Sequence, residues 1–385
     1  MYILMISRGI PTPHYPQWGC FEKDQAEALA RLGHKVIVMS IDARFKRHRG
    51  SLGLHHSSIN GVEYYNQVVL PGELFSRILG RERYWATIKR NYYIRLAEKI
   101  IALHGRPDVI YSQFFTNTAF GVDIKKSFGV PLVAIEHYSK FNDFTFTQLE
   151  KKCAAYAFQG ADKIIAVADT LARNINKLFN KDCSVVHNMF GVEFEGKFNI
   201  SSRDKDKPLV FVSTASLIYR KGFDVLINAF AEAGLPKDKW CMKIIGWGEE
   251  YNNLKRQISE HHLQNNILLL GKMTKSQIVA ELSSSHVFIL PSRSENFSVA
   301  VLEALALGLP VLATECGGIK ECINDSNGVI VPVDNVPALA EGIKQIYSGY
   351  DNFDRVAIAR DSHQRFSPLS IARQITNILE SVTNQ

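Results

Sequence analysis

Short apolar runs alternate with helix-like segments along almost the whole chain, and this alternation constrains the fold more than any other feature. The runs are YILMIS (2–7), KVIVMSI (35–41), DVIYS (108–112), PLVAIE (131–136), KIIAVA (163–168), PLVFVST (208–214), MKIIG (242–246), NILLLG (266–271), HVFIL (286–290), PVLAT (310–314) and GVIVPV (328–333). Strands that alternate with helices of about 10 to 15 residues are typical of parallel sheets with helices on both faces. We therefore predict an α/β fold.

The chain has 385 residues, which is more than one hydrophobic core usually serves, so we expect two domains. The strand-like runs form two series, and the polar stretch EGKFNISSRDKDKP separates them. We predict a first Rossmann-like domain at 1–190, a linker at 191–207 and a second Rossmann-like domain at 208–367. Residues 368–385 contain a helical segment with no following strand, and we expect it to cross back to the first domain.

Several classes of protein are disfavoured by the composition. The first apolar run spans only about six residues before Arg8, which is too short for a signal peptide or a membrane span. The six cysteines include no CxxC pair, which argues against disulfides and zinc. The only Asp-x-Asp, DKD at 204–206, falls in the predicted linker and is interpreted as solvated charge. We expect a cytoplasmic protein without a metal or cofactor.

Positive charge is concentrated in the first half of the chain. Residues 1–190 carry 25 Lys and Arg against 16 Asp and Glu, whereas residues 191–385 carry 20 against 22. Much of the excess lies in RFKRHR (44–49) and in 76–99, where Arg77, Arg81, Arg83, Lys89, Arg90 and Arg95 alternate with Tyr84, Trp85, Tyr92 and Tyr93. This pattern suits an anionic membrane surface, with the protein peripheral at its inner face. It also suits a solvated helix face whose aromatics lie in the core. No nucleic-acid-binding motif accompanies the charge.

Loops after strands of the second series are suited to bind anions, and ligands of doubly wound sheets lie at such loops. They are ASLIYRKGFD, with Arg220 and Lys221 before a helix, PSRSENFS, with Ser298 as a helix cap, and ECGGIKE, with Gly317 and Gly318 before a further helix. Helix N–H groups and basic side chains both favour negative charge. GWGEE, which contains Gly246, is a turn that could approach a ligand. Each loop taken alone also fits an ordinary capped turn.

Two glutamates need an explanation. Glu303 lies among the apolar residues of VAVLEALA, although a buried carboxylate requires a partner, and Glu295 lies in the loop before that helix. Eight helical residues rise roughly 12 Å, which disfavours a glycosidase acid/base pair. The two carboxylates fit contacts with separate parts of one long ligand. Alternatively, backbone amides satisfy Glu303, and Glu295 is an exposed loop charge.

These motifs, in this order, resemble those of the family 4 glycosyltransferases, which have the GT-B fold of two Rossmann-like domains facing across a cleft. The matching segments are WGCFEKDQAEALARLGHKVIV (18–38), IEHYS (135–139), VVHNMFGVEF (185–194), RKG (220–222), GWGEE (246–250), ENFSVAVLE (295–303) and GGIKECI (317–323). The resemblance covers nearly the whole chain. It implies a retaining hexosyltransferase that moves a sugar from a UDP- or GDP-sugar to a glycan or lipid-linked acceptor in cell-surface polysaccharide synthesis.

The resemblance also assigns roles to residues. Glu303 is expected to bind the ribose hydroxyls of the nucleotide and Glu295 the hydroxyls of the transferred sugar, while His137 contacts that sugar near the reacting carbon. The diphosphate is expected to lie against Arg220, Lys221 and the backbone at Phe297 and Ser298, with Gly19 contributing from the first domain. Gly246, Asn296, Gly317 and Gly318 complete the expected binding residues. The departing phosphate is expected to take the proton of the acceptor, without a metal or an enzyme nucleophile.

The sequence departs from the family pattern at two places. The family often has an arginine five residues before its lysine, where this chain has Ser216, so Arg220 is the substitute. Met189 and Phe190 are bulkier than usual in the segment that closes the domains. A buried structural role for His137 is an alternative. A sugar-nucleotide epimerase and a non-catalytic binding protein share this architecture, whereas the absence of G-x-G-x-x-G after either first strand argues against a dehydrogenase.

Overall fold

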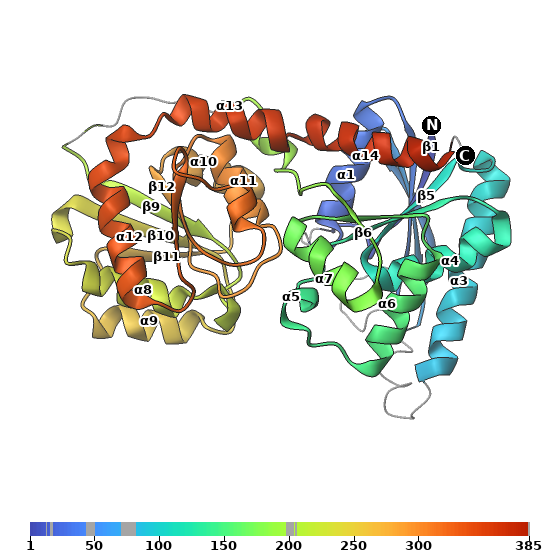
Figure 1. The fold of residues 1–385 in the computed structure, drawn as a ribbon, viewed down its shortest axis with the longest axis horizontal. Coiled ribbons are helices and arrows are strands. Elements are labelled where there is room, and N and C mark those ends of the chain that lie inside the picture. Colours follow the sequence, from blue (N-terminus) through green and yellow to red (C-terminus); the bar gives the residue numbers. More distant parts are fainter. Residues whose placement is uncertain are drawn as a thin grey trace. The chain divides into compact units, whose positions relative to one another are not determined.

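The computed structural model describes the chain except for residues 13, 16–17, 44–50, 71–81, 198–203, 205 and 384–385, and except for the side chains of residues 82–85. The chain divides into two compact units. The first comprises Met1–Val167, Ala172–Val186 and Ile371–Gln385, and the second comprises Ala168–Leu171 and His187–Ser370. Each unit is an α/β structure built on a largely parallel sheet (Figure 1).

The sheet of the first unit has the strand order β3-β4-β2-β1-β5-β6-β7-β8. The strands are β1 (Tyr2–Ile6), β2 (Lys35–Asp42), β3 (Gly53–Ile59), β4 (Val62–Val68), β5 (Val109–Gln113), β6 (Leu132–Glu136), β7 (Lys163–Ala166) and β8 (Ser184–Val185). All pairings are parallel except that of β3 with β4. Since β1 lies between β2 and β5, the strand order reverses direction there. Such a reversal is where doubly wound sheets bind ligands.

The helices of the first unit bury the apolar strands. They are α1 (Cys20–Arg31), α3 (Glu82–His104), α4 (Phe114–Phe128), α5 (Lys140–Asp143), α6 (Gln148–Gly160), most of α7 (Asp169–Phe179) and most of α14 (Pro368–Thr383). Helices α3 and α4 contribute Tyr93, Ile100 and Val122 to a core shared with β1, β2 and β5. Ile371, Ile375 and Leu379 of α14 are fully buried, so α14 forms part of this unit's interior.

The second unit has a six-stranded sheet in the order β11-β10-β9-β12-β13-β14, with every pairing parallel. The strands are β9 (Leu209–Thr214), β10 (Trp240–Ile245), β11 (Ile267–Gly271), β12 (Val287–Leu290), β13 (Val311–Thr314) and β14 (Gly328–Val331). The helices are α8 (Phe223–Ala233), α9 (Tyr251–Glu260), α10 (Lys275–Ser283), α11 (Val299–Ala306), α12 (Val336–Gly349) and α13 (Arg355–Phe366). Here the strand order reverses between β9 and β12. The core lies between this sheet and α8, α9 and α12.

The predicted α/β class and all eleven predicted strands are confirmed. Three strands were missed: β3, β4 and the short β8. The first two form a hairpin closed by Asn60 and Gly61, both with positive φ (53° and 79°). Asn-Gly between two extended runs is a strong hairpin signal in a sequence. It was overlooked because β3, GLHHSSI, is polar and exposed.

The structure differs from two other predictions. The helix expected after Gly317 and Gly318 is a single 3₁₀ turn, η4 (Ile319–Glu321), because the chain turns back towards β14 within a few residues. The predicted linker begins with a 3₁₀ turn, η1 (Val192–Phe194), and Phe194 is completely buried in the second unit. The contacts separate the two units after Val186, four residues before the predicted boundary.

Candidate active site

The turn between β9 and α8 lies against the end of β12, where the strand order of the second unit reverses. Gly222 begins α8 with φ of +66°, and a Cβ atom there would lie 2.0 Å from the carbonyl oxygen of Pro291. Only glycine fits, since it lacks that atom and adopts this conformation without strain. The close approach brings Arg220 and Lys221, in the 3₁₀ turn η2 (Tyr219–Lys221), beside the loop 292–298.

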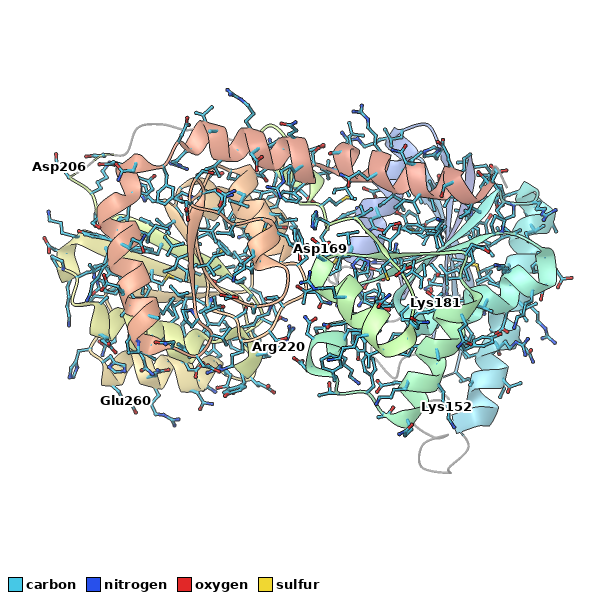
Figure 2. The ribbon with its side chains drawn as sticks, viewed as in Figure 1. Lys152, Asp169, Lys181, Asp206, Arg220 and Glu260 are labelled. Carbon is cyan, nitrogen blue, oxygen red and sulfur yellow. The ribbon has the colours of Figure 1, made fainter. Side chains whose placement is uncertain are left out.

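Arg220, Lys221 and Glu295 form one cluster. Lys221 Nζ donates to Glu295 Oε1, and the Ser292 hydroxyl donates to the same oxygen at 3.0 Å. Arg220, labelled in Figure 2, donates to the Ser294 carbonyl at 2.8 Å and lies 3.8 Å from Glu295 Oε2. Glu295 is buried, which contradicts the alternative of an exposed loop charge. Two cations around one carboxylate leave this corner with a net positive charge, and it is therefore suited to bind an anion.

The glycine loops pack around this cluster. Gly317 has φ of +56°, and a Cβ atom there would lie 2.0 Å from the Glu295 carbonyl oxygen. Gly318 N–H donates to the Asn296 carbonyl at 2.7 Å. Gly246 has a different neighbour, because its Cβ position lies 1.8 Å from the Ala215 carbonyl oxygen beyond β9. Of the predicted residues, Gly317, Gly318, Asn296 and Glu295 therefore lie together, while Gly246 packs at the β9–β10 ends.

Helix α11 begins after Ser298, as the sequence predicted, but the Ser298 side chain makes no capping hydrogen bond. That part of the prediction was wrong: the backbone of Ser298 is extended, as is usual at an N-cap, but its hydroxyl accepts no hydrogen bond from the first turn of α11. The first N–H groups of α11 are thus not satisfied by this side chain, and a helix N-terminus favours an anion. Asn188 Nδ2 donates to the Phe297 carbonyl at 2.9 Å and fixes this loop from the segment 187–194.

Glu303 has a partner that sequence reasoning missed. The Lys275 ammonium, at the start of α10, donates to Glu303 Oε1. Burial raises the pKa of Glu303, and the nearby Lys275 lowers it without cancelling the effect. The carboxylate therefore has a cationic partner, which was expected neither from the resemblance nor from the alternative in which backbone amides satisfy it. Lys275 is 45% exposed, so its ammonium can stay in water when Glu303 takes another partner.

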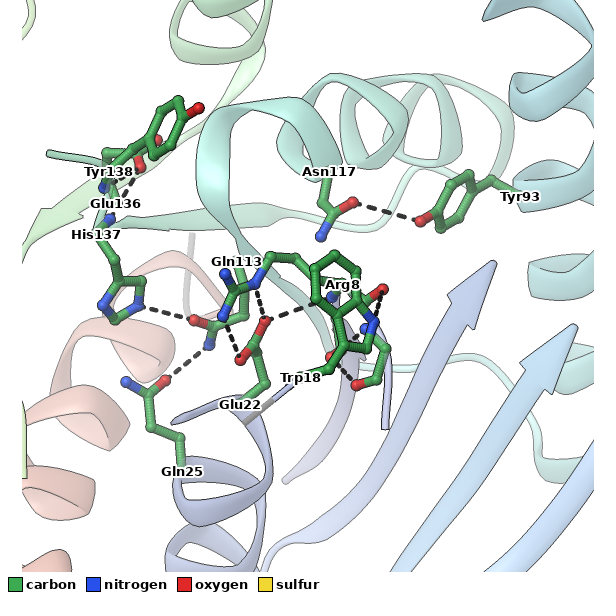
Figure 3. Close-up of polar contacts among 12 residues, drawn as sticks. Arg8, Trp18, Glu22, Gln25, Tyr93, Gln113, Asn117, Glu136, His137 and Tyr138 are labelled. Atoms are coloured by element: carbon green, nitrogen blue, oxygen red, sulfur yellow. Dashed lines mark hydrogen bonds and ion pairs between the residues drawn. The ribbon is translucent and has the colours of Figure 1, made fainter. Parts of the chain in front are cut away.

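In the first unit, polar residues gather where β1, β5 and β6 end (Figure 3). Arg8 follows β1 and forms two bonds to the buried Glu22 of α1, at 2.7 and 3.2 Å. Trp18 Nε1 donates to the Arg8 carbonyl at 3.1 Å. Gly19 begins α1 with φ of +78°, and a Cβ atom there would lie 2.2 Å from the Gly9 carbonyl oxygen. The predicted glycine loop is therefore held tightly against the end of β1.

Glu136, the last residue of β6, is completely buried and binds backbone amides. Its Oε1 accepts from the N–H groups of His137 (2.9 Å) and Tyr138 (2.8 Å), and its Oε2 accepts from Phe115 N–H (2.8 Å). Phe114, before that last donor, has φ of +65°, which is strained for a bulky residue. One carboxylate thus fixes the turns after β5 and β6, including the backbone of His137.

His137 lies in this cluster, and its Nε2 is 2.9 Å from Gln113 Oε1 at the end of β5. The ring is tilted against Phe114 at 5.1 Å between centroids, and the Arg8 guanidinium lies 3.9 Å from the centre of the Phe114 ring. His137 is partly exposed rather than buried. Sequence reasoning missed Arg8, Glu22, Gln113 and Glu136, although Arg8, Gln113 and Glu136 each lie at a strand end where function was sought.

Glu136 makes stability depend on pH. Burial raises the pKa of this carboxyl to about 7 from 4.5, against the lowering effect of the three N–H groups and Arg8. The folded protein therefore keeps this proton over a range where the unfolded chain has lost it, and stability falls as pH rises from about 4.5 to about 7, by about 3 kcal/mol. We expect Glu136→Gln to remove this component, measured as the difference in urea midpoint between wild type and variant at pH 5 and 7.5. An unchanged difference across that range contradicts the assignment.

The basic segment is described only in part. Residues 44–49, Arg77, Arg81 and the side chains of Arg83, Tyr84 and Trp85 lie outside the described residues. Among the others, Arg90 pairs with Asp123 at 3.0 Å and Tyr93 is buried, while Tyr92 is exposed. Lys152 on α6 is also exposed (Figure 2). Membrane binding stays a prediction. Among the described helices, none has the length and apolar character needed to cross a membrane.

The predicted absence of a metal site is not tested by the structure. Among the described residues, no group of three or more His, Cys, Asp or Glu side chains could hold a metal ion. Asp204 and Asp206 of the predicted linker are exposed, and Asp204 pairs with Lys207 at 3.2 Å. Lys205 lies outside the described residues.

Family models match most of the chain. Residues 23–194 match the model described as glycosyltransferase family 4, and residues 195–360 match the model described as glycosyl transferases group 1. The fold is that of the GT-B glycosyltransferases. The two family models and the curated relatives show that the protein is an enzyme that transfers glycosyl groups. The chain belongs to glycosyltransferase family 4, as its sequence motifs indicated.

Relatives and solved structures agree with this membership. An uncharacterized glycosyltransferase of Methanocaldococcus jannaschii is 23% identical over 380 residues, 92% of each chain. The amylovoran biosynthesis glycosyltransferase AmsK of Erwinia amylovora is 32% identical over 202 residues, 49% of each chain. Among solved structures, Anabaena HepE in complex with UDP-glucose has a TM-score of 0.73 at 19% identity, covering 99% of this chain and 100% of that one.

Proposed function

We propose that the protein transfers a hexose from a UDP- or GDP-sugar to a glycan or lipid-linked acceptor in cell-surface polysaccharide synthesis. The observation that carries the proposal is the cluster of Arg220 and Lys221 around Glu295 at the strand reversal of the second unit. Its net positive charge suits a diphosphate. Support for the donor class comes from HepE, which was solved with UDP-glucose, and support for the product class comes from the amylovoran relative.

In the proposed reaction, the bond between the anomeric carbon and the diphosphate oxygen breaks and a bond to the acceptor oxygen forms. The acceptor proton moves to the departing diphosphate, and the anomeric configuration is retained. Arg220, Lys221 and the first N–H groups of α11 stabilise the negative charge that develops on the leaving group. No metal is proposed, because the two cations supply the positive charge that a metal would otherwise supply.

Two carboxylates orient the substrate in this proposal. Glu303 accepts hydrogen bonds from the ribose hydroxyls after its ion pair with Lys275 has opened. Glu295 accepts from hydroxyls of the transferred sugar while keeping Lys221 in place. His137 of the first unit contacts the same sugar. Membrane association at the inner face, through the cations of residues 76–99, remains part of the proposal for a lipid-linked acceptor.

The test is thermal unfolding of wild type and Glu303→Gln against UDP-, GDP-, ADP- and CMP-sugars. A ligand at 100 times its Kd adds about 2.7 kcal/mol, which raises Tm by several degrees for a unit of this size. We expect one nucleotide class to stabilise wild type and to lose most of that effect in the variant. Without nucleotide, the variant is expected to be at least as stable as wild type at pH 7.5, because burial penalises the charge on Glu303.

Glu281→Gln is the matched control, since Glu281 of α10 pairs with Lys243 of β10 at 2.7 Å, outside the cluster. It should keep the full nucleotide shift. If no sugar nucleotide stabilises wild type, the proposed donor class is wrong. If Glu303→Gln keeps the full shift, Glu303 does not bind the ribose. Incubation of the donor without acceptor separates a transferase from an epimerase, since only the epimerase converts the sugar.

A further inference from the structure

A chain of hydrogen bonds runs through the interior of the first unit to His137. The Tyr111 hydroxyl donates to Gln25 Oε1 at 2.9 Å, and Gln113 Nε2 donates to the same oxygen at 2.7 Å. Gln113 Oε1 then lies 2.9 Å from His137 Nε2. Figure 3 shows Gln113 joined by dashed lines to His137 and to Gln25.

The side chains that form this network of hydrogen bonds are buried. Tyr111 and Gln113 are completely buried, and Gln25 is 2% exposed. Buried amides in such surroundings must form hydrogen bonds with one another, because they have no water to bind instead. The orientation of one amide therefore determines the next. Gln25 comes from α1, whereas Tyr111 and Gln113 come from β5, so the chain links a helix to the strand that precedes the loop of Phe114.

The direction of this chain sets the position of a proton. Gln25 Oε1 accepts from both the Tyr111 hydroxyl and Gln113 Nε2, and in this arrangement Gln113 directs its Oε1 to His137. An amide oxygen only accepts, so the imidazole must donate from Nε2, which makes Nδ1 the accepting nitrogen of a neutral ring. We propose that Gln25 and Gln113 are positioning residues that fix His137 as its Nε2–H tautomer for contact with the sugar. This inference rests on the proposed role of His137.

The charged neighbours of His137 bind other groups, and its aromatic neighbours pack against the ring. Glu136 binds the backbone N–H of His137, and Arg8 is engaged by Glu22 and the Phe114 ring. Phe21 is stacked with the His137 ring at 6.4 Å between centroids. If both amides were reversed, Gln113 would donate to Nε2 and the ring proton would move to Nδ1. The tautomer is therefore the quantity to measure.

The experiment is ¹⁵N NMR of histidine-labelled full-length protein at pH 8, where the shifts of the two ring nitrogens identify the tautomer. The protein has twelve histidines, and the signal that is missing from the spectrum of His137→Gln identifies His137. We expect a single Nε2–H tautomer in wild type and averaged shifts in Gln113→Leu and Gln25→Leu. The kcat of Gln113→Leu should fall by about 100-fold, with the KM for the sugar nucleotide changed little.

Thr118→Val is the matched control, because it breaks the buried 2.8 Å bond between Thr118 and Ser112 and the 3.0 Å bond from Thr118 to the Phe114 carbonyl, and leaves the bonds of Gln25 and Gln113 intact. It should keep both the tautomer and kcat. An Nδ1–H tautomer in wild type, or an unchanged tautomer in folded Gln113→Leu, overturns the proposal. The role of His137 and the proposed function fail separately. Full transfer activity of His137→Ala removes the role of His137, whatever the tautomer measurement gives, whereas the proposed function fails if wild type transfers no sugar from any sugar nucleotide.

Discussion

The Lys221→Ala variant is expected to lose about 10²- to 10³-fold in kcat for glycosyl transfer, the typical effect of removing one group that stabilises developing charge. Lys221 is bound to the buried Glu295 and lies at the strand reversal of the second unit. The KM for the sugar nucleotide should change less than kcat, because the charge on the leaving diphosphate grows during the reaction. Initial rates of nucleoside diphosphate release measure both parameters.

Loss of Lys221 also leaves Glu295 with fewer partners, so stability must be separated from chemistry. The double variant Lys221→Ala/Glu295→Gln removes that buried charge and should recover part of the lost stability without recovering kcat. Lys243→Ala is the control, since it breaks a partly buried ion pair between Lys243 of β10 and Glu281 of α10, away from the cluster. A folded Lys221→Ala variant with a turnover number within threefold of wild type would falsify the role given to the cluster.

The Gly222→Ala variant should lose about 3 to 5 kcal/mol of stability in the second unit, because the new methyl group meets the Pro291 carbonyl at 2.0 Å. Backbone atoms cannot move aside as the end of a flexible side chain can. The expected result is a lower Tm together with weaker nucleotide binding, since the same contact places Arg220 and Lys221. Differential scanning calorimetry and nucleotide titration measure the two effects.

Gly234→Ala provides the comparison. Gly234 ends α8 with φ of +64°, nearly the same as Gly222, but the nearest atom to its Cβ position is 3.9 Å away. Its substitution should cost only the conformational strain, about 1 kcal/mol. Equal losses in the two variants would mean that the backbone angle, and not the approach to Pro291, decides the cost.

The fold could largely be predicted because its strands are buried on both faces and appear as continuous apolar runs. VFIL and VLAT, for example, are entirely buried as β12 and β13. The β3–β4 hairpin escaped prediction because β3 is exposed and mostly polar, which leaves only the turn at Asn60 and Gly61 as a signal. Local sequence cannot distinguish such a strand from a loop.

The sequence predicted which residues lie in the candidate site, but not which side chains pair with one another there. Loops after strands identified Arg220, Lys221, Glu295 and His137, because strand ends can be located in the sequence. The pairing of Lys221 with Glu295 joins residues 74 positions apart, and that of Lys275 with Glu303 joins residues 28 apart. Such pairings arise from the packing of helices on the sheet, which no local pattern encodes.

Residues 371–385 belong to the first unit although the whole second unit precedes them in the chain. They contribute four completely buried side chains, Ile371, Ala372, Ile375 and Leu379, and Thr376 bonds His34 at 2.9 Å. During synthesis, the second unit therefore has all its residues before the first unit does. The first unit therefore completes its core only after every residue of the second unit has been synthesised.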